Sequence, residues 1–288
     1  MGVFGRSWKL TRMSFGVIRQ DKEMLFFPVI AGVLSTAFAF LLLFPTIIVG
    51  LLHDQGGEGS TAFGALEYAL VFTVYLGLAF ITTFFNVCVV FTAKTRFEGG
   101  DATFLDSIRF AFGRTHLILA WSLVSATVGV LLYMLDNVAE RAGFIGKLLL
   151  GAVRGILGAM WSIVTLFVIP AMVYHDLGPF EAIRRSVQTL KSTWGESLVR
   201  HYGLGLIQFL FLLLGFGLAV VLFMALGSLG TVGIVIALGV TVAYFLGVIL
   251  VFTVANNIFN TALYAYANGH PPSAFDAETL KNAFQAKA

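Results

Sequence analysis

Residues Tyr202–Leu226 read YGLGLIQFLFLLLGFGLAVVLFMAL, a run without a single charged side chain. A very short link, Gly227–Gly230, follows, and Thr231–Val254 then forms a second uncharged apolar run. A helix needs roughly 20 residues to cross a hydrocarbon core about 30 Å thick. Both runs are long enough, so we expect two transmembrane helices, and the short link predicts that they form a tight antiparallel hairpin.

The composition of the whole chain agrees with this interpretation. Of its 288 residues, 58% are hydrophobic and only 11% are charged, and the mean hydropathy is +0.91. Soluble domains contain about 45–50% apolar and about 25% charged residues. A chain so poor in charge cannot cover a water-facing surface, so we exclude a soluble globular protein.

Six segments are long and apolar enough to span a bilayer: Leu25–Leu52, Tyr68–Phe91, Leu117–Leu135, Leu148–Tyr174, Tyr202–Leu226 and Thr231–Val254. The predicted fold class is therefore an all-α transmembrane bundle of six helices. In the first segment, Pro28 suits a first helical turn, whereas Pro45 would kink or end the helix. In the fourth segment, an entry at Ile156 keeps Arg154 at the headgroups and avoids the cost of a charge within the bilayer.

The basic residues are sorted between the two sides of this arrangement. Of the 18 lysines and arginines, only Arg141, Lys147 and Arg154 fall on one side. Cytoplasmic loops collect Lys and Arg, so we expect both termini in the cytoplasm. The basic N-terminal segment precedes an apolar run too long for a cleaved signal, which predicts an anchor. We divide the chain into a cytoplasmic segment (1–24), a membrane domain (25–267) and a cytoplasmic tail (268–288).

The fourth loop contains the clearest helical pattern outside the spans, beginning at Pro179. Its apolar residues recur at spacings of three and four: Phe180, Ile183, Val187, Leu190 and Trp194. Its basic residues fall elsewhere on the helical wheel: Arg184, Arg185 and Lys191. Such a helix can lie in the membrane interface with its apolar face toward lipid. The alternative is that it packs on the spans as a lid.

Two other segments repeat this theme. In the second loop, the apolar stripe consists of Leu105, Ile108 and Phe112, with Arg109 and Arg114 available to solvent or phosphate. Near the N-terminus, one predicted face consists of Trp8, Thr11, Phe15 and Ile18, and another of Arg12, Arg19 and Lys22. Anionic lipids attract basic segments at the inner surface. The predicted lipid contacts are Arg109, Arg184, Arg185 and Lys191.

An internal repeat links the segments that follow spans two, four and six. Each has a Gly or Gly-Pro break, then Leu or an aromatic residue, an acid, a small residue and a helix start: Glu98–Arg109, Leu177–Arg184 and Asn268–Ala277. One constant offset pairs Asn86 with Asn256, Gly99 with Gly269, and Leu105 with Phe275. We therefore expect three related two-span hairpins, each followed by a surface helix. Chance similarity of helix-start signals is the alternative.

The spans hold amides but no central charges. Four asparagines are predicted at the inner ends of spans two and six: Asn86, Asn256, Asn257 and Asn260. One interpretation is that they join the spans by interhelical hydrogen bonds. The other is a polar vestibule, open to the cytoplasm, that binds a headgroup or small solute. Gly151 and Gly155 form a G-x-x-x-G pattern, which indicates close helix packing.

Searches for catalytic patterns find neither a metalloprotease helix, nor a P-loop, nor a nucleophile elbow. His175 and Asp176 are adjacent and are interpreted as the start of a loop that caps the following helix, and a metal site with His270 is the alternative. Cys88 is the single cysteine and lies in an apolar run, which excludes an intrachain disulfide. We expect no enzyme activity and no cofactor.

Several segments resemble a prokaryotic family of six-span membrane proteins known only as a domain of unknown function. These segments are SWKLT (Ser7–Thr11), DKEMLFFP (Asp21–Pro28), the stretch from Asn86 to Gly99, VIPAMV (Val168–Val173), RSVQTLKSTWGE (Arg185–Glu196) and TALYAYANG (Thr261–Gly269). The chain departs from the pattern at His175-Asp176, where an acid followed by Gly is expected. The resemblance implies six spans in a prokaryotic inner membrane and brings no activity. The repeat is more distantly similar to the membrane domain of some glycerophosphodiester phosphodiesterases.

The leading hypothesis is a non-enzymatic membrane protein that binds lipid or a small solute at its cytoplasmic side and assists transport or membrane organisation. Its expected partners are membrane lipids, with a second copy or another membrane protein as further partners, and no nucleic acid. A small-solute transporter or channel is the second hypothesis and requires a continuous polar path. A membrane-embedded enzyme is the third and requires that His175, Asp176 and another ligand converge.

Overall fold

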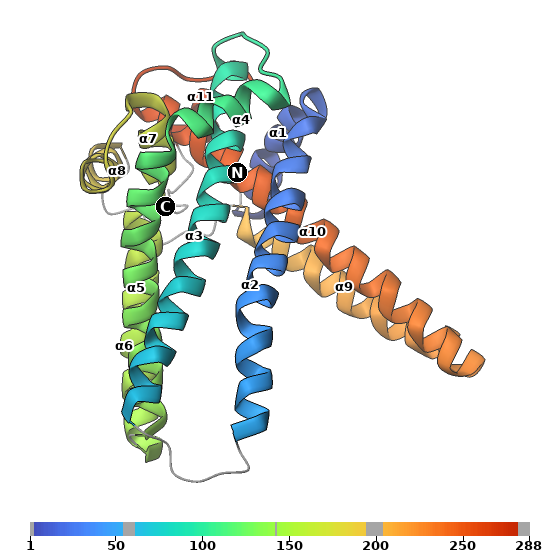
Figure 1. The fold of residues 1–288 in the computed structure, drawn as a ribbon. Helices are drawn as coiled ribbons and strands as arrows, with labels where there is room; N and C mark the ends of the chain where they lie inside the picture. Colours follow the sequence, from blue (N-terminus) through green and yellow to red (C-terminus); the bar gives the residue numbers. More distant parts are fainter. Residues whose placement is uncertain (1–2, 54–60, 142, 194–203, 282–288) are drawn as a thin grey trace. The chain divides into compact units, whose positions relative to one another are not determined.

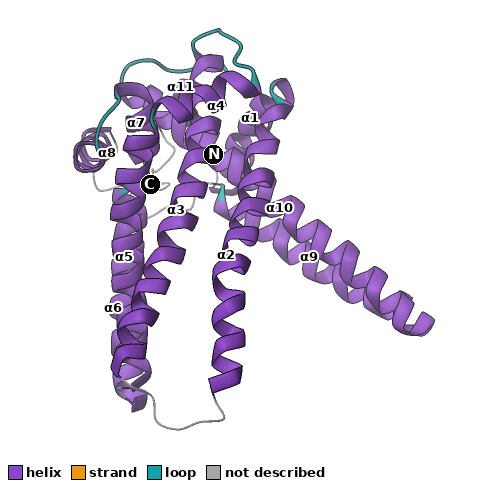
Figure 2. Cartoon of the chain, viewed as in Figure 1, coloured by secondary structure: helices purple, strands orange, loops and turns teal. Residues whose placement is uncertain are grey.

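The computed structural model describes residues 3–53, 61–141, 143–193 and 204–281, and this part of the chain is helical apart from turns and loops (Figures 1 and 2). The α-helices are α1 (Val3–Gln20), α2 (Phe26–His53), α3 (Thr61–Phe97), α4 (Phe104–Gly113), α5 (Thr115–Arg141), α6 (Gly143–Val164), α7 (Val168–His175), α8 (Pro179–Thr193), α9 (Gly205–Leu226), α10 (Gly230–Ala267) and α11 (Ala277–Lys281). Two 3-10 turns are η1 (Lys22–Leu25) and η3 (Gly227–Leu229). Trp194, predicted to end the apolar stripe of the fourth loop, lies outside the described residues.

Five helical segments of the described chain are long and apolar enough to cross a membrane: Lys22–Phe44, Tyr68–Phe97, Thr115–Arg141, Gly143–His175 and Gly205–Ala267. Apolar side chains also lie at the surface of these segments. In α6, for example, no residue is buried and Phe144 is 86% exposed. Soluble monomers rarely expose such continuous apolar patches. The chain is therefore a multi-pass membrane protein with an all-α fold.

The six-span count stays a prediction, because the structure has five candidate segments in its described part. The last of these segments joins two helices. It is 63 residues long and contains α9, η3 and α10. In the first segment, α2 begins at Phe26, which places Pro28 in its first turn as predicted. The helix continues past Pro45 to His53, so this proline does not end it.

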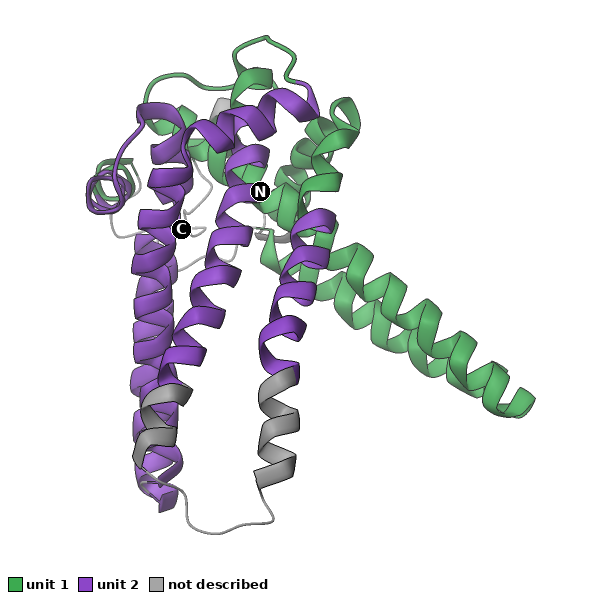
Figure 3. Cartoon of the chain, viewed as in Figure 1, with its two compact units in different colours: residues 1–28, 92–102, 188–288 green, residues 29–91, 103–187 purple. Residues whose placement is uncertain are grey.

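The chain divides into two compact units, which are coloured separately in Figure 3. Unit 1 comprises residues 1–28, 92–102 and 188–288, and unit 2 comprises residues 29–91 and 103–187. The predicted division into a terminal segment, a membrane domain and a tail concerns placement in the membrane and stays a prediction.

In unit 2, α5 packs along α6, and aromatic and charged contacts hold the pair together. The rings of Trp121 and Trp161 stack with centroids 5.8 Å apart. Arg154 donates from Nε to Asp136 Oδ2 at 2.9 Å. This ion pair joins two residues at the predicted outer ends of their spans, where a charge is cheaper than at the bilayer centre.

The G-x-x-x-G pattern of α6 plays no part in packing within the described chain. A Cβ added at Gly151, Gly155 or Gly158 would have no atom of another element within 4 Å. Close approach occurs instead at Gly129, where a Cβ would lie 2.8 Å from the Tyr75 ring, and at Gly77, where it would collide with Phe38. These two glycines let α3 contact α5 and α2.

In unit 1, α9 and α10 run side by side and η3 joins them (Figure 1). Tyr244 Oη on α10 donates to the carbonyl of Phe211 on α9 at 2.9 Å. Gly215 leaves room for the Tyr244 ring, since a Cβ there would collide with it. Gly230 closes the link with a φ of 68°, a left-handed conformation that glycine adopts without strain.

The helix ends at Gly99 and Gly269, which the sequence pairs, have the same backbone geometry. Their φ angles are 82° and 83°. After α3, Gly100 N donates to the Thr95 carbonyl at 2.9 Å, and after α10, His270 N donates to the Ala265 carbonyl at 2.9 Å. This is the bond of a Schellman motif, which ends a helix on a left-handed residue. The structure thus supports the pairing of these two helix ends.

Gly233 lies where α10 begins against the end of α9, so a side chain there should strain the link. A Cβ at this position would collide with the carbonyl oxygen of Leu226, which is backbone and cannot rotate away. We expect Gly233→Ala to lower the melting temperature in detergent by several degrees. Gly239→Ala is the matched control on the same helix, because nothing lies within 4 Å of its Cβ position. Alanine favours a helix by up to about 1 kcal/mol over glycine, so the control should be neutral or stabilising. Equal melting temperatures of the two variants would contradict this account of the link.

Candidate functional site

Exposure changes sharply along α10, and the predicted asparagines lie where it changes. The first part of the helix is largely exposed, whereas the stretch from Phe252 to Ala265 is largely buried. Asn256, Asn257 and Asn260 are half-buried within this stretch. Nearby polar groups bond within the helix, as Thr261 Oγ1 donates to the Asn257 carbonyl at 2.6 Å. The three amides therefore lie at the margin of a packed core.

Asn86 has a corresponding position on α3. It is half-buried between Phe85, which is 7% exposed, and Val87, which is 1% exposed. Asn86 belongs to unit 2 and the other three asparagines to unit 1. The vestibule that would join all four stays a prediction, and so does the alternative that they join spans two and six.

Local hydrogen bonds fix the start of α4. Thr103 and Asp106 form a capping box, in which Asp106 N donates to Thr103 Oγ1 at 3.2 Å and Thr103 N donates to Asp106 Oδ2 at 3.1 Å. The hydroxyl and backbone bonds from Thr103 hold the pKa of the Asp106 carboxyl below its usual value. The acid of the predicted repeat therefore caps this surface helix.

The face that α4 buries differs from the predicted apolar stripe. Ser107 and Ala111 are fully buried, and Cys88 Sγ donates to the Ser107 carbonyl at 3.5 Å. Leu105 and Phe112 are instead 53% and 66% exposed. Ser107 and Ala111 thus pack against the protein, whereas Leu105 and Phe112 of the predicted stripe face outward.

Helix α8 begins at Pro179, as predicted, and follows the same rule in its first turns. Ala182 and Ser186 are fully buried, and Ser186 Oγ accepts a hydrogen bond from Phe167 N at 3.1 Å. Phe180 is 76% exposed. Among the predicted lipid contacts, Arg184 and Lys191 are exposed and Arg185 is half-buried.

Both helices place an exposed arginine one turn after an exposed apolar side chain. Arg109 is exposed and follows Leu105 by four residues on α4, and Arg184 follows Phe180 by four residues on α8. Residues four apart lie on the same helix face. The predicted lipid contacts Arg109 and Arg184 thus each share a face with an apolar residue.

Arg114, which we predicted to be available to solvent or phosphate, is bound within unit 2. Its Nε donates to Asp176 Oδ1, and its guanidinium lies over the Phe110 ring, 3.6 Å from the centroid. Phe110 stacks in turn on Phe91 with centroids 4.0 Å apart. The prediction was wrong because the partner carboxylate is distant in the sequence.

Asp176 also explains the departure from the family pattern at His175-Asp176. It ends α7 with a φ of 54°, a left-handed conformation that costs most residues roughly 1–2 kcal/mol. Glycine would adopt this angle without strain. Aspartate tolerates it better than most residues, and here its carboxylate accepts from Arg114. Asp176 therefore stands where the pattern has glycine. It caps the C-terminal end of α7, whereas we predicted that it caps the following helix, α8.

Charged contacts join segments of unit 1 that are distant in the sequence. Arg96 donates to both carboxylate oxygens of Asp21, at 2.6 and 2.5 Å, and to Asp101 at 2.7 Å. Lys9 on α1 donates to Asp276 at 2.9 Å. Bonds from Thr279 and Lys9 lower the pKa of Asp276 to about 2, so this carboxylate is ionised at every physiological pH. The sequence gives no signal for the Arg96–Asp21 and Lys9–Asp276 pairs, because their members are far apart in the chain.

Within the described residues, no three His, Cys, Asp or Glu side chains converge so as to hold a metal ion. His175 and Asp176 belong to unit 2, and His270 belongs to unit 1. The alternative metal site built from these three residues gains no support.

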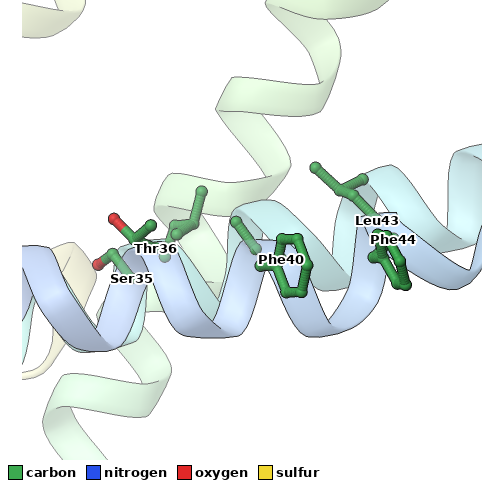
Figure 4. A pocket seen from close by; sticks show the side chains of 7 residues that line it. Ser35, Thr36, Phe40, Leu43 and Phe44 are labelled. Atoms are coloured by element: carbon green, nitrogen blue, oxygen red, sulfur yellow. The ribbon is translucent and has the colours of Figure 1, made fainter. Parts of the chain in front are cut away.

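A groove of about 540 Å³ runs along α2 beside Leu78 (Figure 4). Its other lining residues are Ser35, Thr36, Ala39, Phe40, Leu43 and Phe44. Thr36 Oγ1 donates to the Gly32 carbonyl of its own helix at 2.8 Å. The groove therefore offers a polar solute no charged group and lies in an apolar candidate span.

Comparison with protein-family models identifies a family of unknown function. The model described as "Family of unknown function (DUF6159)" matches residues 65–273, which is more than half of the chain. No curated protein matches the chain. The resemblance to a domain of unknown function is confirmed, whereas the distant likeness to the membrane domain of glycerophosphodiester phosphodiesterases gains no support.

The Arg96–Asp21 pair should be the strongest charged contact of unit 1, because it is bidentate and the Asp21 side chain is only 10% exposed. We expect Asp21→Ala to lower the free energy of unfolding in mixed micelles by roughly 2–4 kcal/mol, since Arg96 then loses its bidentate partner. Asp101→Ala removes a carboxylate that is 79% exposed and should cost less than about 1 kcal/mol. Similar losses for both variants would show that burial does not set the strength of this pair.

Proposed function

Since the chain belongs to DUF6159, a family of unknown function, we propose its role from its own geometry: a six-span, non-enzymatic membrane protein that binds anionic lipid headgroups at its cytoplasmic side. In this proposal both termini lie in the cytoplasm and the protein resides in an inner membrane. Lipid binding would serve membrane organisation or assist transport.

The length of the last apolar segment supports six spans. At 1.5 Å per residue, a single helix of 63 residues would be roughly 95 Å long, about three times the hydrocarbon thickness. The segment instead contains α9 of 22 residues and α10 of 38 residues, which lie side by side. Each is long enough for one crossing. Counting them separately turns five candidate segments into six spans.

The distribution of charge supports the orientation. With six spans, Arg141 and Lys147 fall at the α5–α6 connection, and Arg154 pairs with Asp136 nearby. The helices α1, α4 and α8 then lie on the opposite side together with the remaining basic residues. A bias of this kind marks the cytoplasmic side.

The observation that carries the proposed lipid binding is the exposure pattern of α4 and α8. Leu105 and Phe180 face outward instead of packing inward, and each shares a face with an exposed arginine. Side chains of this kind suit a helix at the membrane interface, where apolar residues enter the acyl region and arginines reach the phosphates. In α8 the exposed Phe180 favours contact with the interface, whereas Leu190 of the same predicted stripe is 3% exposed and packs on the protein, as the lid alternative requires.

The same proposal gives the asparagines of α10 a role beside the headgroups, where their half-buried amides would bond phosphate or glycerol oxygens.

Solute transport would need a polar path through the spans. The described groove along α2 lies in a span but is apolar, so it favours lipid contact instead.

Cysteine labelling in oriented membrane vesicles tests the span count, in a Cys88→Ser background. Ser228 lies in η3 and Ser273 follows α10, and both are exposed. We expect Ser228→Cys to react with an impermeant maleimide only from the outer side and Ser273→Cys only from the cytoplasmic side. Labelling of both cysteines from one side would remove α10 as a span.

Native mass spectrometry tests lipid binding. We expect the double variant Arg109→Ala/Arg184→Ala to retain less phosphatidylglycerol, because basic residues near an anionic surface contribute about 1 kcal/mol each, or up to roughly 30-fold for two. Phosphatidylcholine retention should stay unchanged. The matched control is Arg141→Ala/Lys147→Ala, which removes two exposed cations from the opposite side. Equal losses in both double variants, or none, would contradict the proposal.

A further inference from the structure

The N-terminal helix α1 has a buried face that holds it in a fixed rotation. Ser7, Leu10, Thr11, Ser14, Val17 and Ile18 are all buried. Phe15 packs edge-on against Phe252 of α10 with ring centroids 5.5 Å apart, and Lys9 pairs with Asp276 at 2.9 Å. These contacts lie within unit 1 and come from different positions along α1. The helix therefore cannot turn its opposite face inward without losing them.

The face turned outward carries an aromatic and two cationic side chains. Trp8 is 50% exposed, and Arg12 and Arg19 are exposed. They are four and eleven residues from Trp8, which places all three within about 40° of one another around the helix axis. We predicted that Trp8 shares one face with Thr11 and Ile18, but those two residues are buried. Trp8 therefore belongs with the arginines.

This outward stripe has the arrangement seen on α4 and α8. Arg12 follows Trp8 by four residues, as Arg109 follows Leu105 and as Arg184 follows Phe180. Unlike those helices, α1 carries no Asp or Glu among its 18 residues. All charged side chains of α1 are thus basic. The helix therefore complements a negative surface better than α4 or α8, each of which carries an acid in its first turn.

We propose that Trp8, Arg12 and Arg19 form a docking surface for the anionic surface of the cytoplasmic leaflet. Tryptophan is enriched at membrane interfaces, because its ring is mostly apolar and its N–H reaches polar groups. Arginine binds phosphate through its planar guanidinium. The occupant is a lipid surface, since the three side chains form a narrow stripe that suits the plane of the headgroups. The proposal rests on the proposed orientation of the N-terminus and is independent of lipid binding by α4 and α8.

Quenching of tryptophan fluorescence by brominated lipids tests this docking. The full chain is placed in nanodiscs of phosphatidylcholine that contain an equal fraction of either phosphatidylglycerol or phosphatidylcholine brominated near the top of the acyl chain. The difference between the unmodified chain and Trp8→Phe isolates the signal of Trp8 from the other three tryptophans. We expect Trp8 to be quenched by both lipids, and more strongly by brominated phosphatidylglycerol, since two arginines should enrich anionic lipid locally by up to roughly 30-fold.

Arg12→Gln/Arg19→Gln should abolish the preference for brominated phosphatidylglycerol and leave quenching by brominated phosphatidylcholine. Arg141→Gln/Lys147→Gln is the matched control and should change neither. If neither lipid quenches Trp8, or if an aqueous quencher acts on it as on free tryptophan, the stripe faces water or another protein and the proposal is overturned. An equal response to both lipids overturns the anionic preference. If Trp8 responds as expected while Arg109→Ala/Arg184→Ala keeps its lipid, the proposed lipid binding by α4 and α8 fails and this docking surface stands.

Discussion

The hydrocarbon interior of the membrane is the constraint on which this fold depends. It offers no hydrogen-bond partner, so a spanning backbone must bond within its own helix. Every candidate span of the described chain is accordingly helical. The same solvent removes the usual reason to bury apolar side chains, because lipid solvates leucine as well as a protein core does. Helices such as α6 and α9 can therefore leave nearly all their side chains at the surface.

Along α3 and α10, the two longest helices of the described chain, burial is concentrated in one part. Helices α3 and α10 contain 37 and 38 residues, nearly twice the number that a span requires. Burial is concentrated in the C-terminal part of each, at residues such as Val89, Ala93, Ile258 and Leu263. There the short helices pack against them, including α4 in unit 2 and α1 in unit 1. Each of these two helices thus combines a more exposed part with a packed part.

The sequence predicted the apolar segments well, because their signal is local. It also predicted the start of α8 at Pro179 and the matching of Gly99 with Gly269. It failed where the answer depends on distant partners, as for Arg114, whose carboxylate is contributed by Asp176. The buried face of α4 was not predicted, because small residues such as Ser107 and Ala111 do not stand out in a pattern of apolar side chains. In a protein bathed partly in lipid, Ser107 and Ala111 pack more closely and Leu105 is free to face outward.

On the surface helices, small residues pack on the buried face together with larger ones such as Leu10 and Leu190, while some large residues face outward. Close packing by Ala182 and Ser186 fixes the rotation of α8, as Ser14 and Thr11 help to fix α1. A fixed rotation decides which side chains face outward, and in both helices these include an aromatic residue and an arginine four residues later. Because a helix free to rotate would turn such apolar residues inward, their exposure must be held by the packed face. The buried small residues and the outward arginines are therefore two parts of one arrangement, in which the packing within the protein determines the surface that the headgroups meet.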